Sequence, residues 1–400
     1  MDAAIAHEPE GTMRSRLPNV TRVLPRGASQ QLDLVRGLAA LLVVADHLRS
    51  MYFVKQEDGF DQHWEKALHL SLTLGHQSVM VFFVLSGYLV GGQTLRAWMT
   101  GCWETRRYAI ARMSRLWTVI LPAIAIGVAV DRLGIHLFGE HGIYGAAAGK
   151  NMQLSVSSTL GAREIVGNAA FVQTVRVETV GSNVPLWSIA NEFWYYTIFP
   201  CLIAVAVVRS TAWRVVIGLA VVAALLFVGH DIALYGTIFG FGAALSMLPP
   251  MDLLARTAIR RLLWAGFPLA MAAGRLAPDG YLADLLVAVP FGVLLLAIVN
   301  NRRHEDLRFG TAARQLAAFS FTLYAVHFPL LVFGKAWVEE SSSDLWQPTF
   351  RNLAAGAGIW LATVSVAALM ALLFERRTSR VRAWATRRFD NQRVAAAVVI

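Results

Sequence analysis

The sequence predicts an all-α polytopic membrane protein with about ten transmembrane helices and both termini in the cytoplasm. Hydrophobic residues make up 56% of the 400 residues, whereas charged residues make up only 16%. An ordinary soluble domain carries about 25% charged residues. Apolar segments of roughly 20 residues, the length that crosses a bilayer core, recur along the chain. The basic residues gather in alternate loops between these segments, which is typical of membrane topology.

We interpret ten apolar segments as membrane spans, with nine or eleven as the alternatives. The seventh is short and interrupted by Pro268, and the sixth is Gly-rich and ends at Pro249-Pro250. The ten segments cover residues 32–52, 71–95, 116–134, 186–208, 212–229, 231–248, 261–276, 281–299, 315–335 and 353–374.

The basic residues predict the orientation. If the N-terminus is cytoplasmic, the cytoplasmic side holds 26 of the 36 Lys and Arg residues. This bias follows the positive-inside rule, and it fits an even number of spans. It also explains the net charge of +10 without nucleic acid as a partner.

The predicted organisation is one membrane domain between two basic tails. Residues 1–31 contain no apolar core of a signal peptide. We expect them to form a disordered basic tail in the cytoplasm. Residues 32–375 form the transmembrane domain, in which an outer loop, 135–185, carries a helix-like stretch at AREIVGNAAFVQTV. Residues 376–400 form a basic cytoplasmic tail, typical of a surface helix near anionic lipid.

Two ionisable residues share one face of the first span. Arg36 and His47 are eleven residues apart, which places them within about 20° around the helix and roughly 16 Å apart along it. Ionisable groups inside a membrane are costly and usually face a protein or water-filled interior. The pair therefore predicts a polar stripe through half the bilayer.

A buried carboxylate is the expected partner of His47. Glu192 lies about six residues into the fourth span, which runs inward, so its depth matches that of His47 in the outer half of the membrane. A carboxylate beside a histidine fixes the tautomer and stabilises the imidazolium, as a general base requires.

The other polar residues in or next to the spans each allow a blander interpretation. His327 could be a hydrogen-bonded interior histidine, and Ser86-Gly87 could be helix packing through small residues. An arginine pair before the third span could be a positive-inside flank. The residues in question are Ser86, Arg112, Arg115, Tyr324 and His327, the last two on one helix face.

Five motifs in order give the chain its resemblance to a known family. They are Arg36-x10-His47, FFVLSGYLV (82–90), Arg112-x-x-Arg115, Trp187-Ser188-x3-Glu192 and Tyr324-x2-His327. In this order, across residues 32 to about 375, they resemble the acyltransferase 3 family of integral membrane acyltransferases. Some members carry a C-terminal SGNH-type esterase domain, but only about 25 residues follow the tenth span, so a stand-alone form is expected.

The resemblance implies acyl transfer from cytoplasmic acyl-CoA to a hydroxyl of a carbohydrate or glycolipid, without a metal. It implies a site in the bacterial cytoplasmic (inner) membrane, with exopolysaccharide or O-antigen among the acceptors. Acetyl, from acetyl-CoA, is the commonest group in the family. Succinyl transfer and transfer to a macrolide are the alternatives. The oligomeric state stays open.

Roles for the eight candidate residues follow from this reading. His47 would be the general base, oriented by Glu192, with Tyr324, His327 or Asn191 stabilising the oxyanion. The guanidinium groups would bind the CoA phosphates, so the cofactor-binding residues would be Arg36, Arg112, Arg115 and Ser86. In an alternative mechanism His47 is a transient acyl carrier, and the sequence does not distinguish this relay from direct transfer. A glycan or solute transporter is the alternative from another class, because polar intramembrane residues also mark substrate paths.

Overall fold

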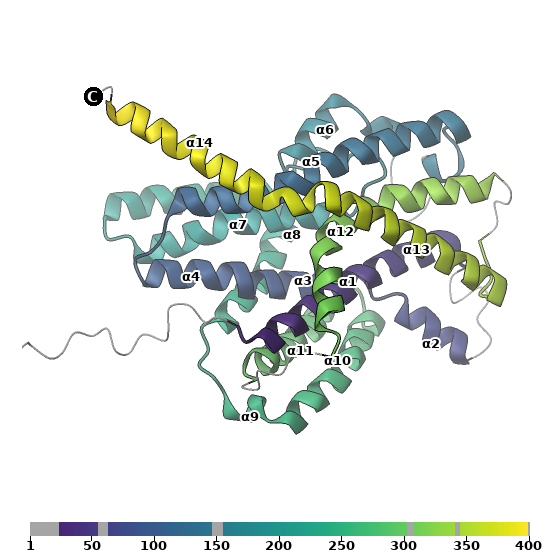
Figure 1. Ribbon diagram of the computed structural model, residues 1–400, viewed down its shortest axis with the longest axis horizontal. Helices are drawn as coiled ribbons and strands as arrows, with labels where there is room; N and C mark the ends of the chain where they lie inside the picture. Colours follow the sequence, from purple (N-terminus) through teal and green to yellow (C-terminus); the bar gives the residue numbers. More distant parts are fainter. Residues whose placement is uncertain (1–23, 55–62, 146–154, 302–307, 341–344, 399–400) are drawn as a thin grey trace, which may run out of the picture.

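A computed structural model describes residues 24–54, 63–145, 155–301, 308–340 and 345–398, and within these ranges the protein is an all-α polytopic membrane protein (Figure 1). The predicted disorder of residues 1–23 lies outside these ranges, as do residues 146–154 of the outer loop. The first half of the chain contains α1 (Arg26–Tyr52), α2 (His63–Ser71), α3 (Gly75–Ser86), a π-helical turn (Gly87–Gly91), α4 (Gly92–Met99), α5 (Thr105–Phe138) and α6 (Ala162–Ala169). The second half contains α7 (Leu186–Val207), α8 (Thr211–Leu245), α9 (Asp252–Ala255), α10 (Thr257–Leu276), α11 (Tyr281–Val299), α12 (Gly310–Glu339), α13 (Phe350–Leu373) and α14 (Thr378–Val398).

Eight helical runs of the described chain are long and apolar enough to cross a membrane. One of them, α8, covers both the fifth and the sixth predicted segments, and its backbone is non-helical at Gly229 (φ 83°, ψ 179°). The seventh segment lies in α10, which contains Pro268 and is not among the eight. The fold class is confirmed, and the number of ten crossings stays a prediction.

Two predicted boundaries move, and the C-terminal tail is helical. The first helix begins at Arg26, directly after Pro25, so residues 26–31 are helical and not part of a disordered tail. Proline is compatible with a helix start because its missing N–H would be unpaired there. The helix that contains the third predicted span, α5, begins at Thr105, so Arg112 and Arg115 lie within a helix and not in a flanking loop. The C-terminal tail is mostly one helix, α14.

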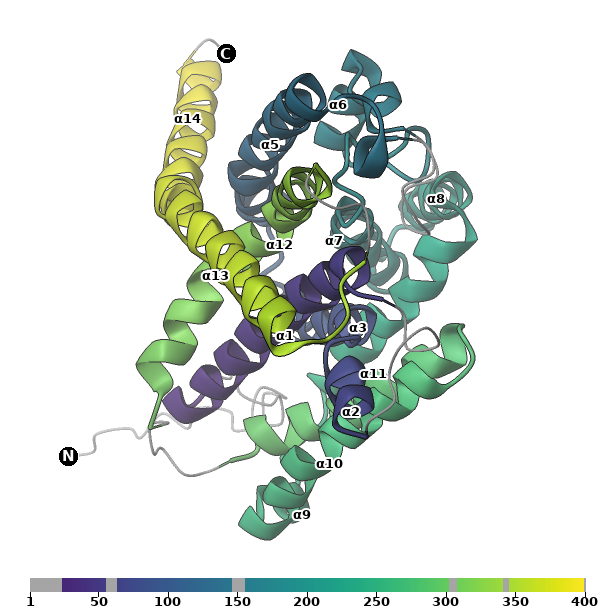
Figure 2. The ribbon, with the colours of Figure 1, turned by 90° about the vertical axis from the view of Figure 1, so that its right-hand side faces the viewer.

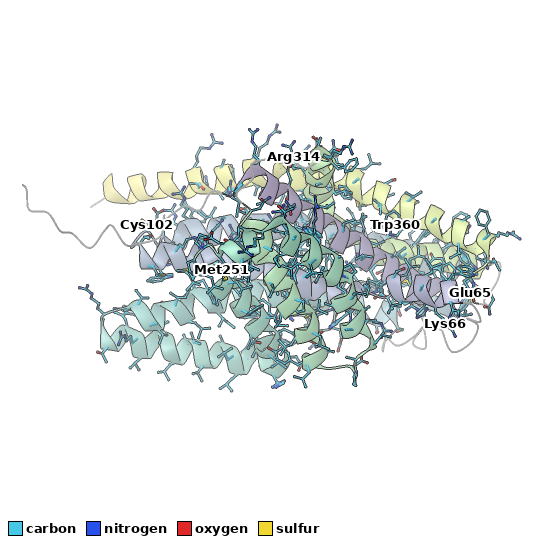
Figure 3. All side chains as sticks on the ribbon, turned by 90° about the horizontal axis from the view of Figure 1, so that it is seen from below. Glu65, Lys66, Cys102, Met251, Arg314 and Trp360 are labelled. Carbon is cyan, nitrogen blue, oxygen red and sulfur yellow. The ribbon has the colours of Figure 1, made fainter. Side chains whose placement is uncertain are left out.

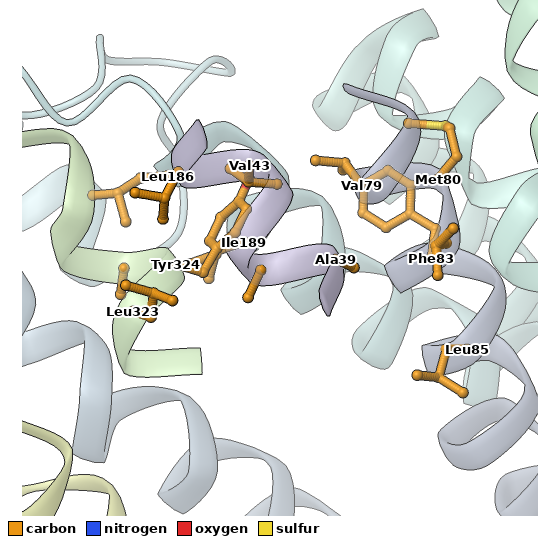
Figure 4. Packing of buried hydrophobic residues seen from close by; sticks show 14 of the residues in the cluster. Ala39, Val43, Val79, Met80, Phe83, Leu85, Leu186, Ile189, Leu323 and Tyr324 are labelled. Atoms are coloured by element: carbon orange, nitrogen blue, oxygen red, sulfur yellow. The ribbon is translucent and has the colours of Figure 1, made fainter. Parts of the chain in front are cut away.

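The helices α1 and α3 lie at the centre of the bundle. Viewed end-on in Figure 2, α5, α12 and α13 lie on one side of them and α8, α10 and α11 on the other. The most extensive packing of α1 is against α12, and it also contacts α3 and α13. Figure 4 shows how Ala39 and Val43 of α1, Val79 and Phe83 of α3 and Leu323 of α12 contribute to one buried apolar cluster.

Glycines set two close helix contacts. A Cβ on Gly37 of α1 would lie 2.7 Å from Cβ of Leu316 in α12. A Cβ on Gly87, where the π-helical turn begins, would lie 2.8 Å from the backbone carbonyl carbon of Phe239 in α8. Small residues let helix backbones approach closely within a membrane. The packing interpretation of the Ser86-Gly87 pair therefore holds for the glycine.

Candidate active site

A polar cavity of about 320 Å³ lies between α1, α3, α5, α7 and α12. Val79 and Gln93 both line it and are fourteen residues apart on the continuous run α3 to α4, so the cavity extends for about 20 Å along the bundle. Its charged and polar lining comprises Arg36, Ser86, Gln93, Arg112, Arg115, Ser188, Glu192, Tyr196, Ser320 and Tyr324. Six of the eight predicted site residues are in this set.

Three arginines make one end of the cavity strongly basic. We call it the arginine end, defined by Arg36, Arg112 and Arg115. Arg36 donates from Nη2 to Oδ1 of Asp33 at 2.6 Å. The guanidinium of Arg112 lies 5.9 Å from the ring centre of Tyr196, and that of Arg115 lies over Phe321.

Two of these guanidinium groups retain unused donors. The Nε atoms of Arg36 and Arg112 are buried, and no residue in the described part of the chain accepts a hydrogen bond from them. A buried donor without a partner costs about 1–3 kcal/mol. An anionic ligand in the cavity would supply the missing acceptors, and phosphate suits the guanidinium fork.

Glu192 forms a compact cluster with two hydroxyl groups. Its Oε1 accepts from Ser86 Oγ at 2.9 Å and from the Tyr196 hydroxyl, one helical turn away. The two hydroxyl oxygens are themselves 2.9 Å apart. The proton of Ser86 is therefore directed at a carboxylate, with no imidazole beside it, which argues against Ser86 as a nucleophile.

Tyr324 closes the cavity away from the arginine end. Its hydroxyl donates to the carbonyl oxygen of Pro185 at 3.2 Å and accepts from Ser188 Oγ at 2.6 Å. His327 follows one turn later, with ring centres 5.8 Å apart. Helix spacing thus places the pair on one face, as predicted.

The two predicted histidines form a stacked pair. The ring centres of His47 and His327 are 5.3 Å apart at an angle of 27°, and the rings of His47 and Phe328 meet in a T-shaped contact with centres 4.9 Å apart. Nδ1 of His327 lies 2.8 Å from the carbonyl oxygen of Tyr324. Because a carbonyl can only accept, we assign the proton to Nδ1, which leaves Nε2 as an acceptor. That Nε2 is buried and has no partner among the described residues.

The predicted pairing of His47 with Glu192 does not occur in the structure. Within the described residues, no hydrogen bond or ion pair joins the two side chains. The physical reason is rotational position: His47 lies on the face of α1 that packs on α12, whereas Glu192 points from α7 toward Ser86 at the end of α3.

A hydrogen-bond network anchors the outer loop beside this site, and the sequence interpretation missed it. The buried carboxylate of Asp131 in α5 accepts from the backbone N–H and the hydroxyl of Ser182, at 2.8 and 2.7 Å. Asn183 donates to the carbonyl oxygen of Ala325 at 2.8 Å. That carbonyl lacks its helical donor because Pro329 has no N–H. An isolated aspartate in the apolar stretch VAVDRLG was the available signal.

The sequence matches one protein-family model over most of its length. A family model described as an acyltransferase domain, Acyl_transf_3, matches residues 29–374. The chain belongs to the acyltransferase 3 family. The match covers nearly the whole chain and includes every candidate site residue. Neither the curated proteins nor the solved structures contain a match.

Membership of the acyltransferase 3 family makes the protein a multi-pass membrane acyltransferase. An enzyme of this kind has an acceptor substrate, and its helices sit in a lipid bilayer. The polar cavity at the centre of the bundle, together with the histidine pair next to Tyr324 that does not line it, is consequently the candidate active site of this acyltransferase 3 protein.

Proposed function

We propose that the protein is an O-acyltransferase that moves an acyl group from acyl-CoA to a hydroxyl of a carbohydrate or glycolipid. The observation that carries this proposal is the cavity, in which buried Nε donors of Arg36 and Arg112 have no acceptor at one end. Coenzyme A has phosphates at one end of a long arm. The arginine end would hold the phosphates, and the arm would run along the cavity toward Tyr324.

His47 is the general base in this proposal. It removes the proton of the acceptor hydroxyl, whose oxygen attacks the thioester carbonyl. The carbon–sulfur bond then breaks, and the imidazolium returns its proton to the thiolate of CoA. The stacked ring of His327 supports this assignment, because it packs against the ring of His47, and its unprotonated Nε2 could accept a hydrogen bond from another hydroxyl of the acceptor substrate. In that tautomer His327 cannot donate to an oxyanion, so we assign that task to Tyr324. Its hydroxyl would exchange its bond to the Pro185 carbonyl for one to the oxyanion.

Glu192 takes a different role from the predicted one. Its bonds to Ser86 and Tyr196 support a carboxylate that shapes the middle of the cavity and fixes the two hydroxyl groups. It balances part of the positive charge that the arginine end brings into the membrane. Ser86 then contacts the CoA arm and does not attack the thioester.

Donor, acceptor and membrane complete the proposal. We propose acetyl-CoA as donor, with succinyl as the alternative, and a cell-surface or exported glycan such as exopolysaccharide or O-antigen as acceptor. The excess of Lys and Arg at the arginine end supports its placement on the cytoplasmic side of a bacterial inner membrane. Mass spectrometry of surface glycans from a deletion strain would identify acyl group and acceptor together.

The test is transfer by membrane vesicles that contain the full-length protein and receive labelled acetyl-CoA on the cytoplasmic side. His47→Gln is expected to lower transfer by at least about 100-fold, the usual contribution of a general base. His230→Gln is the matched control, because that histidine is exposed in α8 and remote from the cavity lining. Normal transfer by His47→Gln would overturn the base assignment. Transport of unmodified glycan without acylation would overturn the whole proposal.

A second experiment separates direct transfer from an acyl relay. The protein is incubated with labelled acetyl-CoA and no acceptor, and the peptide that contains His47 is analysed by mass spectrometry. Direct transfer predicts an unmodified peptide. A labelled imidazole would establish the relay, in which His47 carries the acyl group itself.

A further inference from the structure

A second hollow lies on the outer surface of the bundle, between α12 and α13. It measures about 740 Å³ and shares no lining residue with the polar cavity. On α12 it is lined by the exposed face that begins at Thr311 and ends at Phe319. The opposite face of the same helix supplies Ser320 and Tyr324 to the polar cavity. The groove therefore faces the surroundings of the bundle, not its centre.

The groove is charged at one end and mostly apolar along the rest. Arg314 of α12 and Arg376, just after α13, both line one end of the groove, where α12 begins and α13 ends. This is the same side of the bundle as the arginine end of the polar cavity. Farther along, the lining is mostly apolar and includes Ala318, Leu369 and Leu372, beside the polar Gln315 and Ser365. Leu369 is 63% exposed. A groove with a basic end and a mostly apolar remainder matches an amphiphile that lies parallel to the helices, with its charged head at the basic end.

Both guanidinium groups are available to a ligand. In the described part of the chain, neither Arg314 nor Arg376 lies within ion-pair distance of a carboxylate. Arg314 makes only long bonds inside its own helix turn, to Gly310 O at 3.4 Å and to Thr311 Oγ1 at 3.3 Å. Figure 3 places Arg314 at the periphery of the bundle.

A half-buried carboxylate fixes the shape of the charged end of the groove. Glu375, the residue before Arg376, accepts from the backbone N–H of Thr322 at 3.1 Å and from its hydroxyl at 2.7 Å. These bonds tie the end of α13 to the middle of α12. The arginine next to Glu375 is thereby positioned before any ligand arrives, which lowers the entropy cost of binding.

We propose that this groove binds one anionic phospholipid from the leaflet at the arginine end. Its phosphate would lie between Arg314 and Arg376, and one acyl chain would follow Ala318, Leu369 and Leu372. Charge complementarity decides the occupant: two open guanidinium groups select a net negative headgroup over a zwitterionic one. The proposal does not depend on the reaction that the protein catalyses.

Native mass spectrometry of the detergent-purified, full-length protein tests it. Equal amounts of phosphatidylglycerol and phosphatidylethanolamine are added, and retention of each lipid is measured. The wild type is expected to retain one phosphatidylglycerol in preference. Arg314→Gln with Arg376→Gln should weaken that retention by about tenfold or more. The matched control removes the same charge outside the groove, as Arg380→Gln with Arg382→Gln in α14.

The apolar part of the groove has its own test. Ala318→Trp fills the groove without a change of charge and should also remove the preference for phosphatidylglycerol, whereas Ala220→Trp on the exposed face of α8 should not. Equal retention of phosphatidylglycerol by wild type and by both groove variants would overturn the proposal. Competition by glycerol phosphate as strong as by the lipid would leave only an anion site. A tenfold preference for a polyprenyl phosphate over phosphatidylglycerol would assign the groove to that lipid instead.

Discussion

Replacement of Arg112 by glutamine is expected to raise the KM for acyl-CoA by about 10- to 100-fold and to change kcat much less. The guanidinium lines the cavity with a buried and unpaired Nε, so a bound phosphate would be its main polar partner. A hydrogen bond to a charged group contributes about 1.5–3 kcal/mol, and each 1.4 kcal/mol is a factor of ten in affinity. Arg112→Lys should fall between wild type and Arg112→Gln, because lysine keeps the charge but loses the planar fork.

The measurement is initial-rate transfer in proteoliposomes as a function of acyl-CoA concentration. An interaction made equally in the ground state and the transition state appears in KM and not in kcat. Arg107→Gln is the matched control, since Arg107 lies on the same helix, is exposed and is outside the cavity lining. An unchanged KM in correctly folded Arg112→Gln, or an equal rise in Arg107→Gln, would refute placement of the phosphates at this arginine.

Three further substitutions test other parts of the structure. Ser86→Ala should lower transfer by less than about tenfold, because its hydroxyl donates to a carboxylate; a loss as complete as that of the base variant would make Ser86 a nucleophile. Asp131→Asn should lower the free energy of unfolding by about 1–3 kcal/mol, because it weakens both hydrogen bonds to Ser182. The measurement is the thermal midpoint of unfolding in detergent, and an unchanged midpoint would contradict the anchoring role. Gly87→Ala should destabilise by about 1–3 kcal/mol through overpacking against the backbone of α8, whereas Gly218→Ala, with open space around its Cβ, should be neutral in the same unfolding assay.

Hydropathy was sufficient for the fold class and insufficient for the exact helix ends. Apolar length locates a span because a bilayer selects for about 20 apolar residues. A helix continues past the apolar part where polar residues are also good helix formers, so α1 starts at Arg26 and α5 at Thr105. The predicted boundary between the fifth and sixth segments, at residues 229–231, coincides with the non-helical backbone of Gly229, which separates two helical parts of α8.

Motif spacing was informative within one helix and failed between helices. Tyr324 and His327 share a face because helix geometry fixes neighbours three apart. The depth of Glu192 could be estimated from its position along a span, but its rotation toward α3 depends on packing that only the assembled bundle determines. For the same reason the stacking of His47 on His327 was not predicted, although both were singled out. The groove between α12 and α13 gave no signal, since its arginines look like an ordinary basic flank.

The proline in α12 restricts how the outer loop can change. The Ala325 carbonyl that Pro329 leaves open accepts a hydrogen bond from Asn183, and Ala325 lies two residues before His327 of the histidine pair. Insertions between residues 181 and 185 would pull Asn183 away and leave a buried carbonyl unpaired, next to the reacting groups. Insertions earlier in the loop would not affect this contact. Homologues with other acceptors are therefore expected to differ in loop length before residue 180 and to keep a fixed length from there to α7.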